Sequence, residues 1–228
     1  KIPLMKDYSV DIAGFLKDSD SCGLIFANPN APTGIFLPLK KIELLLENYP
    51  SDRVVIIDEA YVDFGGDSAL EFLDRYENLV IIRTFSKSMS LAGIRLGYVI
   101  SGKKSTDALF TVKDSFNSYP VDILSQIMGE IAISDTDYYK VIIEKVVSTR
   151  EYLSFALREI GWNVLPSKAN FIFASREGLT GREIYLKLKE KGILVRYFDI
   201  DGIKNFVRIS IGTREDMEHL LTQIKETF

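Results

Sequence analysis

Three segments of the sequence decide the fold: GLIFA at residues 23–27, LKKIELLL at residues 39–46 and VVIIDE at residues 54–59. The first and third contain short apolar runs with polar flanks, a pattern that is typical of buried strands. The middle segment has leucine and isoleucine at helical spacing, with Pro38 directly before its first turn. A strand, a helix and a second strand in this order predict a parallel α/β sheet.

Two further apolar runs, at residues 79–82 and 96–100, extend this predicted sheet. The carboxyl ends of parallel strands meet at one edge of a sheet, where ligands bind. Asn28, Asp58 and Thr84 stand at or next to these strand ends. We therefore expect the functional site at this edge.

The pattern of apolar residues changes from strand-like runs to helical spacing after Pro120. Helical spacing covers residues 123–131 and then residues 135–160, with Gly161 as the predicted stop. The remaining segments alternate between strand and helix patterns: strands at 163–165, 171–174, 193–196 and 206–211, a helix from Thr180 to Gly192, and a last helix with Thr213 and Asp216 at capping-box spacing. We predict a large domain over residues 1–134 and a small α+β domain over residues 135–228.

The composition excludes several classes of function. The chain has 28 Lys and Arg against 32 Asp and Glu, a net charge of −4, which is a poor match to nucleic acid or an anionic membrane. Cys22 is the only cysteine and His219 the only histidine, so one chain cannot build a disulfide or a multi-histidine metal site. No apolar run approaches the roughly 18 residues of a membrane span. We expect a cytoplasmic protein that acts on small molecules without a metal.

Asp58 and Glu59 form an acidic strand end that suits more than one ligand. An ATPase would pair it with a glycine-rich loop that ends in Gly-Lys-Ser or Gly-Lys-Thr. Residues 97–103 match the glycine and lysine positions, but Lys104 replaces the hydroxyl residue that holds magnesium. The segment is also strand-like, so its amides would bond within the sheet and not to phosphates. The sequence disfavours an ATPase.

Lys87 lies within TFSKS, residues 84–88, and by itself is typical of a surface lysine in a loop. Its neighbours suggest a different interpretation. A lysine near another cation is more easily deprotonated and can then bond to an aldehyde. Arginine and hydroxyl groups hold phosphates, and a strand-end acid can pair with a pyridine nitrogen. Pyridoxal 5′-phosphate combines these three features, and the groups that would hold it are Thr84, Ser86, Arg95 and Asp58.

Several motifs in the same order resemble the fold type I aminotransferases, and within them the histidinol-phosphate aminotransferases. The motifs are NPNAPTG at 28–34, DEAY at 58–61, RTFSK at 83–87, LAGIRLGY at 91–98, FNSYP at 116–120, ANF at 169–171, VRYF at 195–198 and VRISIGTRE at 207–215. The resemblance runs from the first predicted strand to the end of the chain. It implies an α/β fold of the aspartate aminotransferase type, a mostly parallel sheet flanked by helices with a smaller C-terminal α+β domain.

The resemblance also implies roles for individual residues. Lys87 would hold the cofactor covalently and move the substrate proton, Asp58 would keep the pyridine nitrogen protonated, and Tyr61 would bond to the ring hydroxyl. Substrate anions would be bound by Arg208 for the carboxylate of glutamate and Arg196 for the phosphate of histidinol phosphate. The other implied contacts are Asn30, Thr84, Ser86 and Arg95 with the cofactor, and Asn170 with the substrate.

The reaction that the resemblance implies belongs to histidine biosynthesis. It converts histidinol phosphate and 2-oxoglutarate to imidazole-acetol phosphate and L-glutamate, and the reverse, in a homodimer. An aromatic aminotransferase and a threonine-phosphate decarboxylase on the same scaffold are alternatives. A third is a truncated scaffold without catalysis, because the family's N-terminal segment is not among these 228 residues.

The turn after the first strand departs from the family pattern. Much of the family has an asparagine directly before Pro-Thr-Gly, whereas this chain has Ala31. We expect Asn30 to substitute for that asparagine, with Asn28 as the alternative.

Overall fold

The computed structural model describes residues 1–228 except 19, 118 and 120. Ser118 and Pro120, part of the 116–120 motif, therefore lie outside the described residues. The α-helices are α1 (Ile12–Lys17), α2 (Leu39–Asn48), α3 (Lys103–Phe116), α4 (Ile123–Ser134), α5 (Thr136–Glu159), α6 (Gly181–Glu190) and α7 (Arg214–Thr227). The strands are β1 (Gly23–Ala27), β2 (Val54–Asp58), β3 (Leu79–Thr84), β4 (Gly97–Ser101), β5 (Trp162–Val164), β6 (Phe171–Arg176), β7 (Arg196–Tyr197) and β8 (Val207–Ser210).

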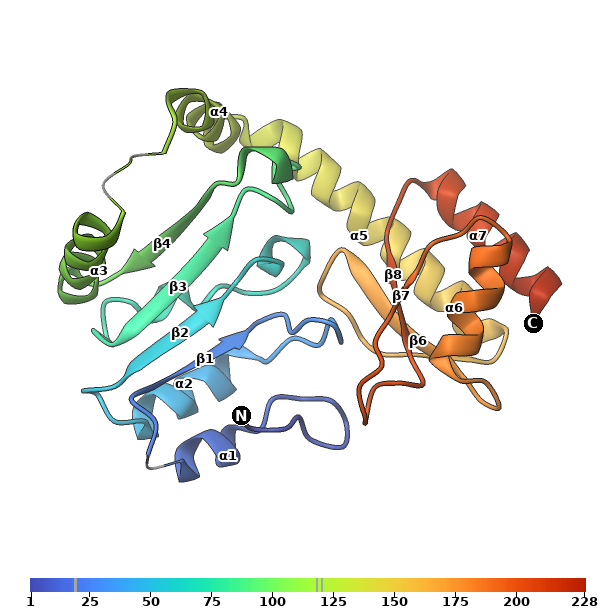
Figure 1. Ribbon diagram of the computed structural model, residues 1–228, viewed down its shortest axis with the longest axis horizontal. Coiled ribbons are helices and arrows are strands. Elements are labelled where there is room, and N and C mark those ends of the chain that lie inside the picture. The colour runs from blue at the N-terminus through green and yellow to red at the C-terminus, as the bar shows by residue number, and fades with distance from the viewer. Residues whose placement is uncertain (19, 118, 120) are drawn as a thin grey trace.

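The first sheet has the strand order β1-β2-β3-β4 (Figure 1). β1, β2 and β3 are parallel, as the sequence predicts, and β4 runs antiparallel to β3. The register pairs Ala27 with Asp58 and Asp58 with Ile82. The carboxyl ends of the three parallel strands therefore lie at one edge of the sheet.

The core of the first sheet forms because α2 presents its apolar stripe to the strands. Ile42, Leu45 and Leu46 of α2 are buried against Val55 and Ile57 of β2 in one hydrophobic cluster. Burying a leucine or isoleucine side chain contributes about 1.5–3 kcal/mol. This packing fixes the β2 strand, and with it the position at which Asp58 ends the strand.

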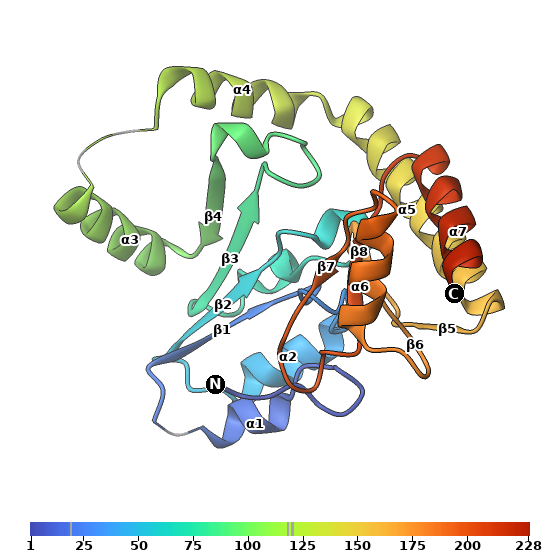
Figure 2. The same ribbon diagram turned by 45° about the vertical axis from the view of Figure 1, so that its right-hand side comes forward.

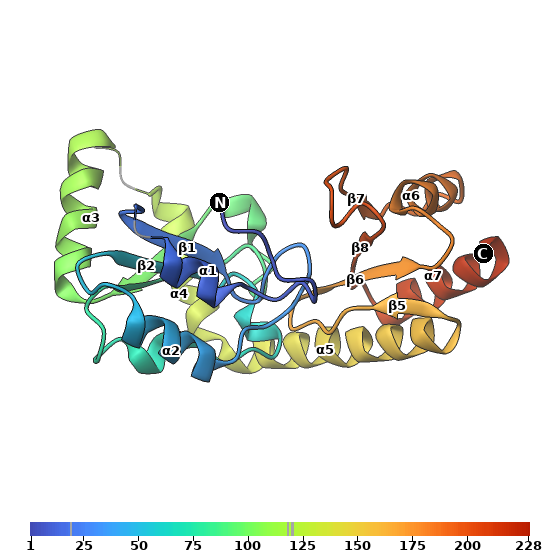
Figure 3. The ribbon, with the colours of Figure 1, turned by 90° about the horizontal axis from the view of Figure 1, so that it is seen from below.

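The second sheet is antiparallel, with the order β5-β6-β8-β7. Its apolar cluster combines Ile172 of β6 and Val207 of β8 with residues of α5, α6 and α7. Figure 3 shows this sheet and its helices beside the first sheet, with α5 running beneath both. The predicted α+β character of the C-terminal region is confirmed.

Two contacts connect the first sheet's loops to the segment before β6. Arg150 of α5 is 1 % exposed and donates hydrogen bonds to the carbonyl oxygens of Phe64 and Ala169, at 2.7 and 3.0 Å. The Lys168 amide donates to the Gly34 carbonyl at 2.8 Å. The two sheets are thereby joined on the side where the parallel strands end.

The sequence missed two helices and misplaced one strand. The sequence patterns predict neither α1 nor α3, and neither helix has a buried residue in the structure. The strand predicted at residues 193–196 is wrong, since β7 is Arg196–Tyr197 alone. Gly97 and Tyr98 lie in β4 and pair with β3, which confirms that their segment forms no phosphate loop.

No helix within the described ranges is both long enough and apolar enough to cross a membrane.

Candidate active site

Asp58, Tyr61 and Lys87 lie at the carboxyl edge of the first sheet. Asp58 ends β2, Tyr61 follows three residues later, and Lys87 follows the end of β3. The Lys87 Nζ atom lies 5.2 Å from the centre of the Tyr61 ring. The structure thus brings the lysine and tyrosine together, from segments that are 26 positions apart in the sequence.

Asp58 and Lys87 are only half-buried. One carboxylate oxygen of Asp58 accepts a hydrogen bond from the Ala60 amide at 2.9 Å, which orients the carboxyl group. In the described part of the chain, the charged contact of Lys87 is with an aromatic ring and not with a carboxylate. Its amine is therefore available to bond to a ligand.

The two hydroxyl residues of the motif lie beside the backbone that leads to Arg95. The Ser86 amide donates to Thr84 Oγ1 at 3.1 Å, and the Phe85 amide donates to the Leu96 carbonyl at 3.2 Å. Arg95 itself is exposed and has a left-handed backbone (φ 54°). Hydroxyl and guanidinium donors in one loop suit a phosphate group.

α4 supports this loop from outside, crossing above the ends of β3 and β4 (Figure 2). The Ser125 hydroxyl donates to the Ile94 carbonyl at 3.2 Å. A Cβ atom at Gly129 would lie 2.5 Å from Leu96 Cδ2, so the helix approaches the loop as closely as glycine allows. The loop that carries Arg95 is therefore held by tertiary contacts.

The structure separates the roles of the two asparagines after β1. Asn28 is 1 % exposed. Its side-chain amide donates to the Leu37 carbonyl and accepts from the Leu37 backbone amide, so it connects the two ends of this turn. Asn30 is half-buried, and its side chain donates to Thr33 Oγ1 at 2.8 Å. Because both polar groups of the Asn28 side chain are bonded to Leu37, Asn30 is the better candidate for the cofactor contact.

Arg208 of β8 has the clearest unmet bonding capacity. Its Nε atom is buried and has no hydrogen-bond partner among the described residues. Its guanidinium carbon lies 4.9 Å from the centre of the Phe171 ring and 5.7 Å from that of Phe198. A buried donor without a partner is costly, so this geometry is typical of a site that an anion completes.

Arg196 lies directly opposite Arg208 in the β7–β8 register. Like charges in this position destabilise a strand pair. The Arg196 guanidinium packs over Phe198 at 5.4 Å, so both arginines contact the same ring. Two adjacent guanidinium groups, one of them with a free donor among the described residues, are chemically suited to anionic groups.

Phe171 connects the arginine pair to the lysine. Its ring meets the Tyr61 ring edge-on, with 5.1 Å between centroids, and it also contacts the Arg208 guanidinium. The contacts therefore continue from Lys87 through Tyr61 and Phe171 to Arg208. Asn170, directly before Phe171, is half-buried, and its backbone carbonyl accepts from the Ile211 amide at 2.9 Å.

Sequence reasoning missed a group of charged side chains behind this site. Asp63 lies in the segment that follows β2 and forms an ion pair of 3.0 Å with Arg83. Arg83 also pairs with Glu59 at 2.9 Å. The alternation of side chains along β2 and β3 could have shown that Glu59 and Arg83 share a face.

Tyr98 of β4 lies opposite Arg83 in the strand register. Burial raises the pKa of its phenol, the Arg83 charge opposes this increase, and the Asp63 and Glu59 carboxylates add to it. The phenol therefore stays protonated at neutral pH.

The residues of the site fit pyridoxal 5′-phosphate. Lys87 offers an amine that is not paired with a carboxylate in the described structure, and Asp58 offers an oriented carboxylate. Thr84, Ser86 and Arg95 offer phosphate donors, and the unpartnered Arg208 Nε offers a place for a substrate anion. Each functional group of the cofactor has a chemically matched residue.

Comparison with known proteins agrees with this fold and site. The family model for aminotransferase class I and II matches residues 1–224. The chain belongs to this family. The histidinol-phosphate aminotransferase of Syntrophus aciditrophicus is 54% identical to this aminotransferase chain over 230 residues, and that of Brachyspira hyodysenteriae is 49% identical over 226 residues. These alignments cover 100% and 99% of the chain.

A solved structure extends the similarity to three dimensions. The histidinol-phosphate aminotransferase of Sinorhizobium meliloti, in complex with pyridoxal 5′-phosphate, superposes with a TM-score of 0.88 at 26% identity and covers 100% of this chain. The expected fold of the type I aminotransferases is thereby confirmed. The chain spans 63% of that structure, and 64% and 63% of the Syntrophus and Brachyspira relatives.

Proposed function

We propose that this chain forms the catalytic site of a histidinol-phosphate aminotransferase of histidine biosynthesis. The enzyme interconverts histidinol phosphate and 2-oxoglutarate with imidazole-acetol phosphate and L-glutamate. The observation that carries the proposal is the continuous set of contacts from Lys87 through Tyr61 and Phe171 to Arg208, with Arg196 opposite Arg208. The similarity to relatives of that name supports it.

Pyridoxal 5′-phosphate, when bound, supplies an aldehyde that exchanges amino groups and a ring that accepts electron density. Lys87 would anchor it covalently, and its Nζ atom would then carry the proton to and from the substrate carbon that bears the amino group. Asp58 would hold a proton at the ring nitrogen, and Tyr61 would donate to the ring hydroxyl. The phosphate would be bound by Thr84, Ser86 and Arg95, while Asn30 would contact the ring.

The arginine pair would serve the two substrates in turn. Glutamate carries a carboxylate where histidinol phosphate carries a phosphate, and a guanidinium fork can bond to either group with two parallel hydrogen bonds. Arg208 would bind the carboxylate and Arg196 the phosphate, with Asn170 contacting the substrate beside them. Binding of the carboxylate or phosphate by these arginines would orient the reacting carbon of the substrate toward the Lys87 amine.

Borohydride reduction tests the assignment of Lys87. The purified protein is mixed with pyridoxal 5′-phosphate, reduced, digested and analysed by mass spectrometry. We expect the label on Lys87 and none after Lys87→Ala, and we expect amino transfer to fall by at least about 10²–10⁴-fold in that variant. A label on another lysine would overturn the proposal.

Substrate comparison tests the reaction. Activity with histidinol phosphate is measured beside activity with phenylalanine and with threonine phosphate. We expect the highest kcat/KM for histidinol phosphate, because Arg196 favours a phosphate and the reaction needs no loss of carbon dioxide. A preference for phenylalanine would indicate an aromatic aminotransferase, and decarboxylation of threonine phosphate would indicate the decarboxylase.

An absorbance assay addresses the alternative of a scaffold without catalysis. Pyridoxal 5′-phosphate is added to the 228-residue chain, followed by glutamate. We expect a cofactor band that bleaches with glutamate. Free-cofactor absorbance alone would favour the non-catalytic scaffold for this chain.

We also propose a homodimer in the cytoplasm and a division into domains at residues 134 and 135. Large apolar side chains are exposed along α3 and α4, including Phe110, Phe116, Ile123, Leu124 and Ile131, and such a surface is typical of an interface. Sedimentation velocity tests the dimer, and limited proteolysis tests the domain boundary.

A further inference from the structure

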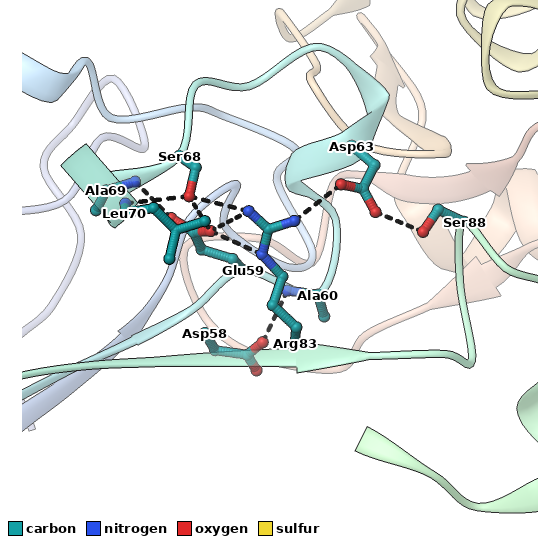
Figure 4. A network of polar contacts seen from close by, with 9 residues as sticks. All are labelled: Asp58, Glu59, Ala60, Asp63, Ser68, Ala69, Leu70, Arg83 and Ser88. Atoms are coloured by element: carbon teal, nitrogen blue, oxygen red, sulfur yellow. Dashed lines mark hydrogen bonds and ion pairs between the residues drawn. The ribbon is translucent and has the colours of Figure 1, made fainter. Parts of the chain in front are cut away.

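Five side chains form a polar cluster behind the candidate active site (Figure 4). Arg83 is at its centre and donates to Glu59 from Nε at 3.0 Å, to an Asp63 oxygen at 3.0 Å and to the Ser68 hydroxyl at 2.9 Å. The Ser88 hydroxyl donates to the other Asp63 oxygen. We name Glu59, Asp63, Ser68, Arg83 and Ser88 the Arg83 cluster.

The Arg83 cluster lies on the opposite face of the sheet from the cofactor residues. The β2–β3 register pairs Asp58 with Ile82, and the Glu59 amide bonds to the Ile82 carbonyl at 2.9 Å. Because successive side chains alternate between faces, Glu59 and Arg83 point away from the face that carries Asp58 and Thr84.

Four of the five members of the cluster are nevertheless close in sequence to a residue of the site. Glu59 follows Asp58, and Arg83 precedes Thr84. Asp63 lies two residues after Tyr61. Ser88 follows Lys87 directly.

The cluster is buried and fully bonded at its acidic end. Glu59 is 1 % exposed, and its carboxylate accepts from the Ala69 amide at 2.7 Å, the Ser68 hydroxyl at 2.8 Å and Arg83. Ser88 is 3 % exposed. Buried ion pairs contribute little net stability, because desolvation offsets their attraction, but their directional bonds define one arrangement of the chain.

We propose that the Arg83 cluster positions the Lys87 amine against Asp58 and Tyr61, with Ser88 as the link to the lysine; the inference rests on the proposed function of Lys87. The bonds run from Glu59 through Arg83 and Asp63 to Ser88, so they tie the end of β2 to the residue that follows the lysine. The loop after Lys87 also contains Ser90 with a left-handed backbone (φ 54°). The Ser88 bond to Asp63 is the polar link in the cluster between this loop and the segment that follows Tyr61.

A displacement of the lysine by about 1 Å slows its reactions by as much as 100-fold, whereas contacts made elsewhere on the cofactor are unaffected. The cluster members are positioning residues in this sense, because they act through Lys87; of them, Glu59 and Arg83 face away from the cofactor side. Their removal should alter the reaction of the amine more than the binding of the phosphate.

The test compares the purified protein with the variants Ser88→Ala, Asp63→Asn and the double variant. The rate of covalent attachment of pyridoxal 5′-phosphate to Lys87 is followed by absorbance and confirmed by borohydride trapping and peptide mapping. Pyridoxamine 5′-phosphate, which cannot bond to the lysine, reports affinity through the remaining contacts. We expect each single variant to slow attachment by about ten- to 100-fold, with pyridoxamine 5′-phosphate affinity unchanged within about twofold.

The double variant distinguishes a shared pathway from independent effects. If Ser88 acts through Asp63, the double variant is expected to be no slower than the slower single variant. The matched control is Thr180→Ala, which removes a hydroxyl-to-carboxylate hydrogen bond of 2.8 Å in α6 and is expected to keep the parental rate. If Ser88→Ala does not fold, Asp63→Asn carries the comparison.

Attachment to Lys87 at the parental rate in the folded variants would overturn the inference and leave the proposed function intact. An equal loss of attachment rate and pyridoxamine 5′-phosphate affinity would also overturn it, by indicating general damage to the site. Absence of Lys87 labelling in the unsubstituted protein would overturn the proposed function itself and the inference with it.

Discussion

At the scale of single residues, Arg208 and Arg196 both contact the Phe198 ring and lie opposite each other on β8 and β7, but they differ in burial. The Nε of Arg208 is buried and has no hydrogen-bond partner in the described part of the chain, whereas Arg196 is exposed. A charge-assisted hydrogen bond contributes about 1.5–3 kcal/mol when the alternative is an unpaired buried group. The two arginines should therefore be separable by substitution.

Arg208→Gln is expected to raise KM for glutamate by roughly 10- to 150-fold, because a charge-assisted bond of about 1.5–3 kcal/mol is lost. Arg196→Gln is expected to raise KM mainly for histidinol phosphate. Arg208→Lys should not restore the parental value, since an ammonium lacks the planar fork. Steady-state kinetics with each substrate varied in turn makes the measurement, and equal effects on both substrates would contradict the assignment.

Position 34 requires glycine for two reasons: its backbone is left-handed, and a side chain there would collide with Ser167. Its φ is 79°, and a Cβ atom there would lie 2.4 Å from Ser167 Oγ. Gly178 has a φ of 78° but no atom within 4 Å of its Cβ position, so it provides a matched control.

Gly34→Ala is expected to lower the free energy of unfolding by about 2–4 kcal/mol, because left-handed strain and overpacking add. Gly178→Ala should cost about 1–2 kcal/mol from the backbone alone. Urea unfolding of both variants measures the difference. Equal costs would mean that the Ser167 contact relaxes freely.

At the scale of elements, α6 begins with a capping box between Thr180 and Glu183. The Thr180 amide and hydroxyl donate to the Glu183 carboxylate, at 2.7 and 2.8 Å, and these bonds lower the pKa of Glu183 from its ordinary value of 4.5. A carboxyl group with a lowered folded pKa stabilises the fold above its unfolded pKa. That contribution is lost as pH falls through the folded pKa.

The difference in Tm between the parental chain and Glu183→Ala is therefore expected to be constant near neutral pH and to shrink as pH falls below about 4.5. Thermal unfolding between pH 3 and pH 7 makes the measurement. A difference that grows toward low pH would show that the capping bonds do not favour the ionised carboxylate.

The elements differ in how far the sequence could predict them. β1, β2 and α2 have apolar runs and stripes that match their buried faces, so they could be predicted closely. The apolar residues of α3 are exposed, so this helix does not contribute to the core from which the other elements are predicted. The site motifs could be placed at strand ends, but the convergence of Arg83 with Asp63 and Ser88 needs the loops to fold back, and no spacing encodes that.

At the scale of the whole molecule, Arg150 joins the two sheets. Its buried guanidinium bonds to Phe64, near Tyr61, and to Ala169, next to Asn170. Arg158, on the same helix, bonds to the Val164 carbonyl at 2.9 Å, within the second sheet's own unit. Substitution of Arg150 tests a contact between the two sheets, whereas substitution of Arg158 tests a contact within the second sheet's unit alone.

Arg150→Met is expected to lower the free energy of unfolding by about 2–4 kcal/mol, since two buried carbonyl groups lose their donor. It should also split unfolding into two transitions, because the buried side-chain link between the sheets is lost and the Lys168–Gly34 bond and the Tyr61–Phe171 contact remain. Arg158→Met should lower stability but keep a single transition. Calorimetry distinguishes the two, and a single transition in Arg150→Met would show that the sheets are coupled by other contacts.

The opposed arginines of β7 and β8 also have a consequence for discrimination between amines. β7 has only two residues, and one of them is Arg196, so mutual repulsion weakens the edge of the sheet until a negative charge arrives. At the proposed substrate site, an anionic amine would relieve this repulsion as it enters. A neutral or cationic amine, such as a polyamine, would leave the repulsion in place or add to it, so we expect such amines to bind more weakly than anionic ones.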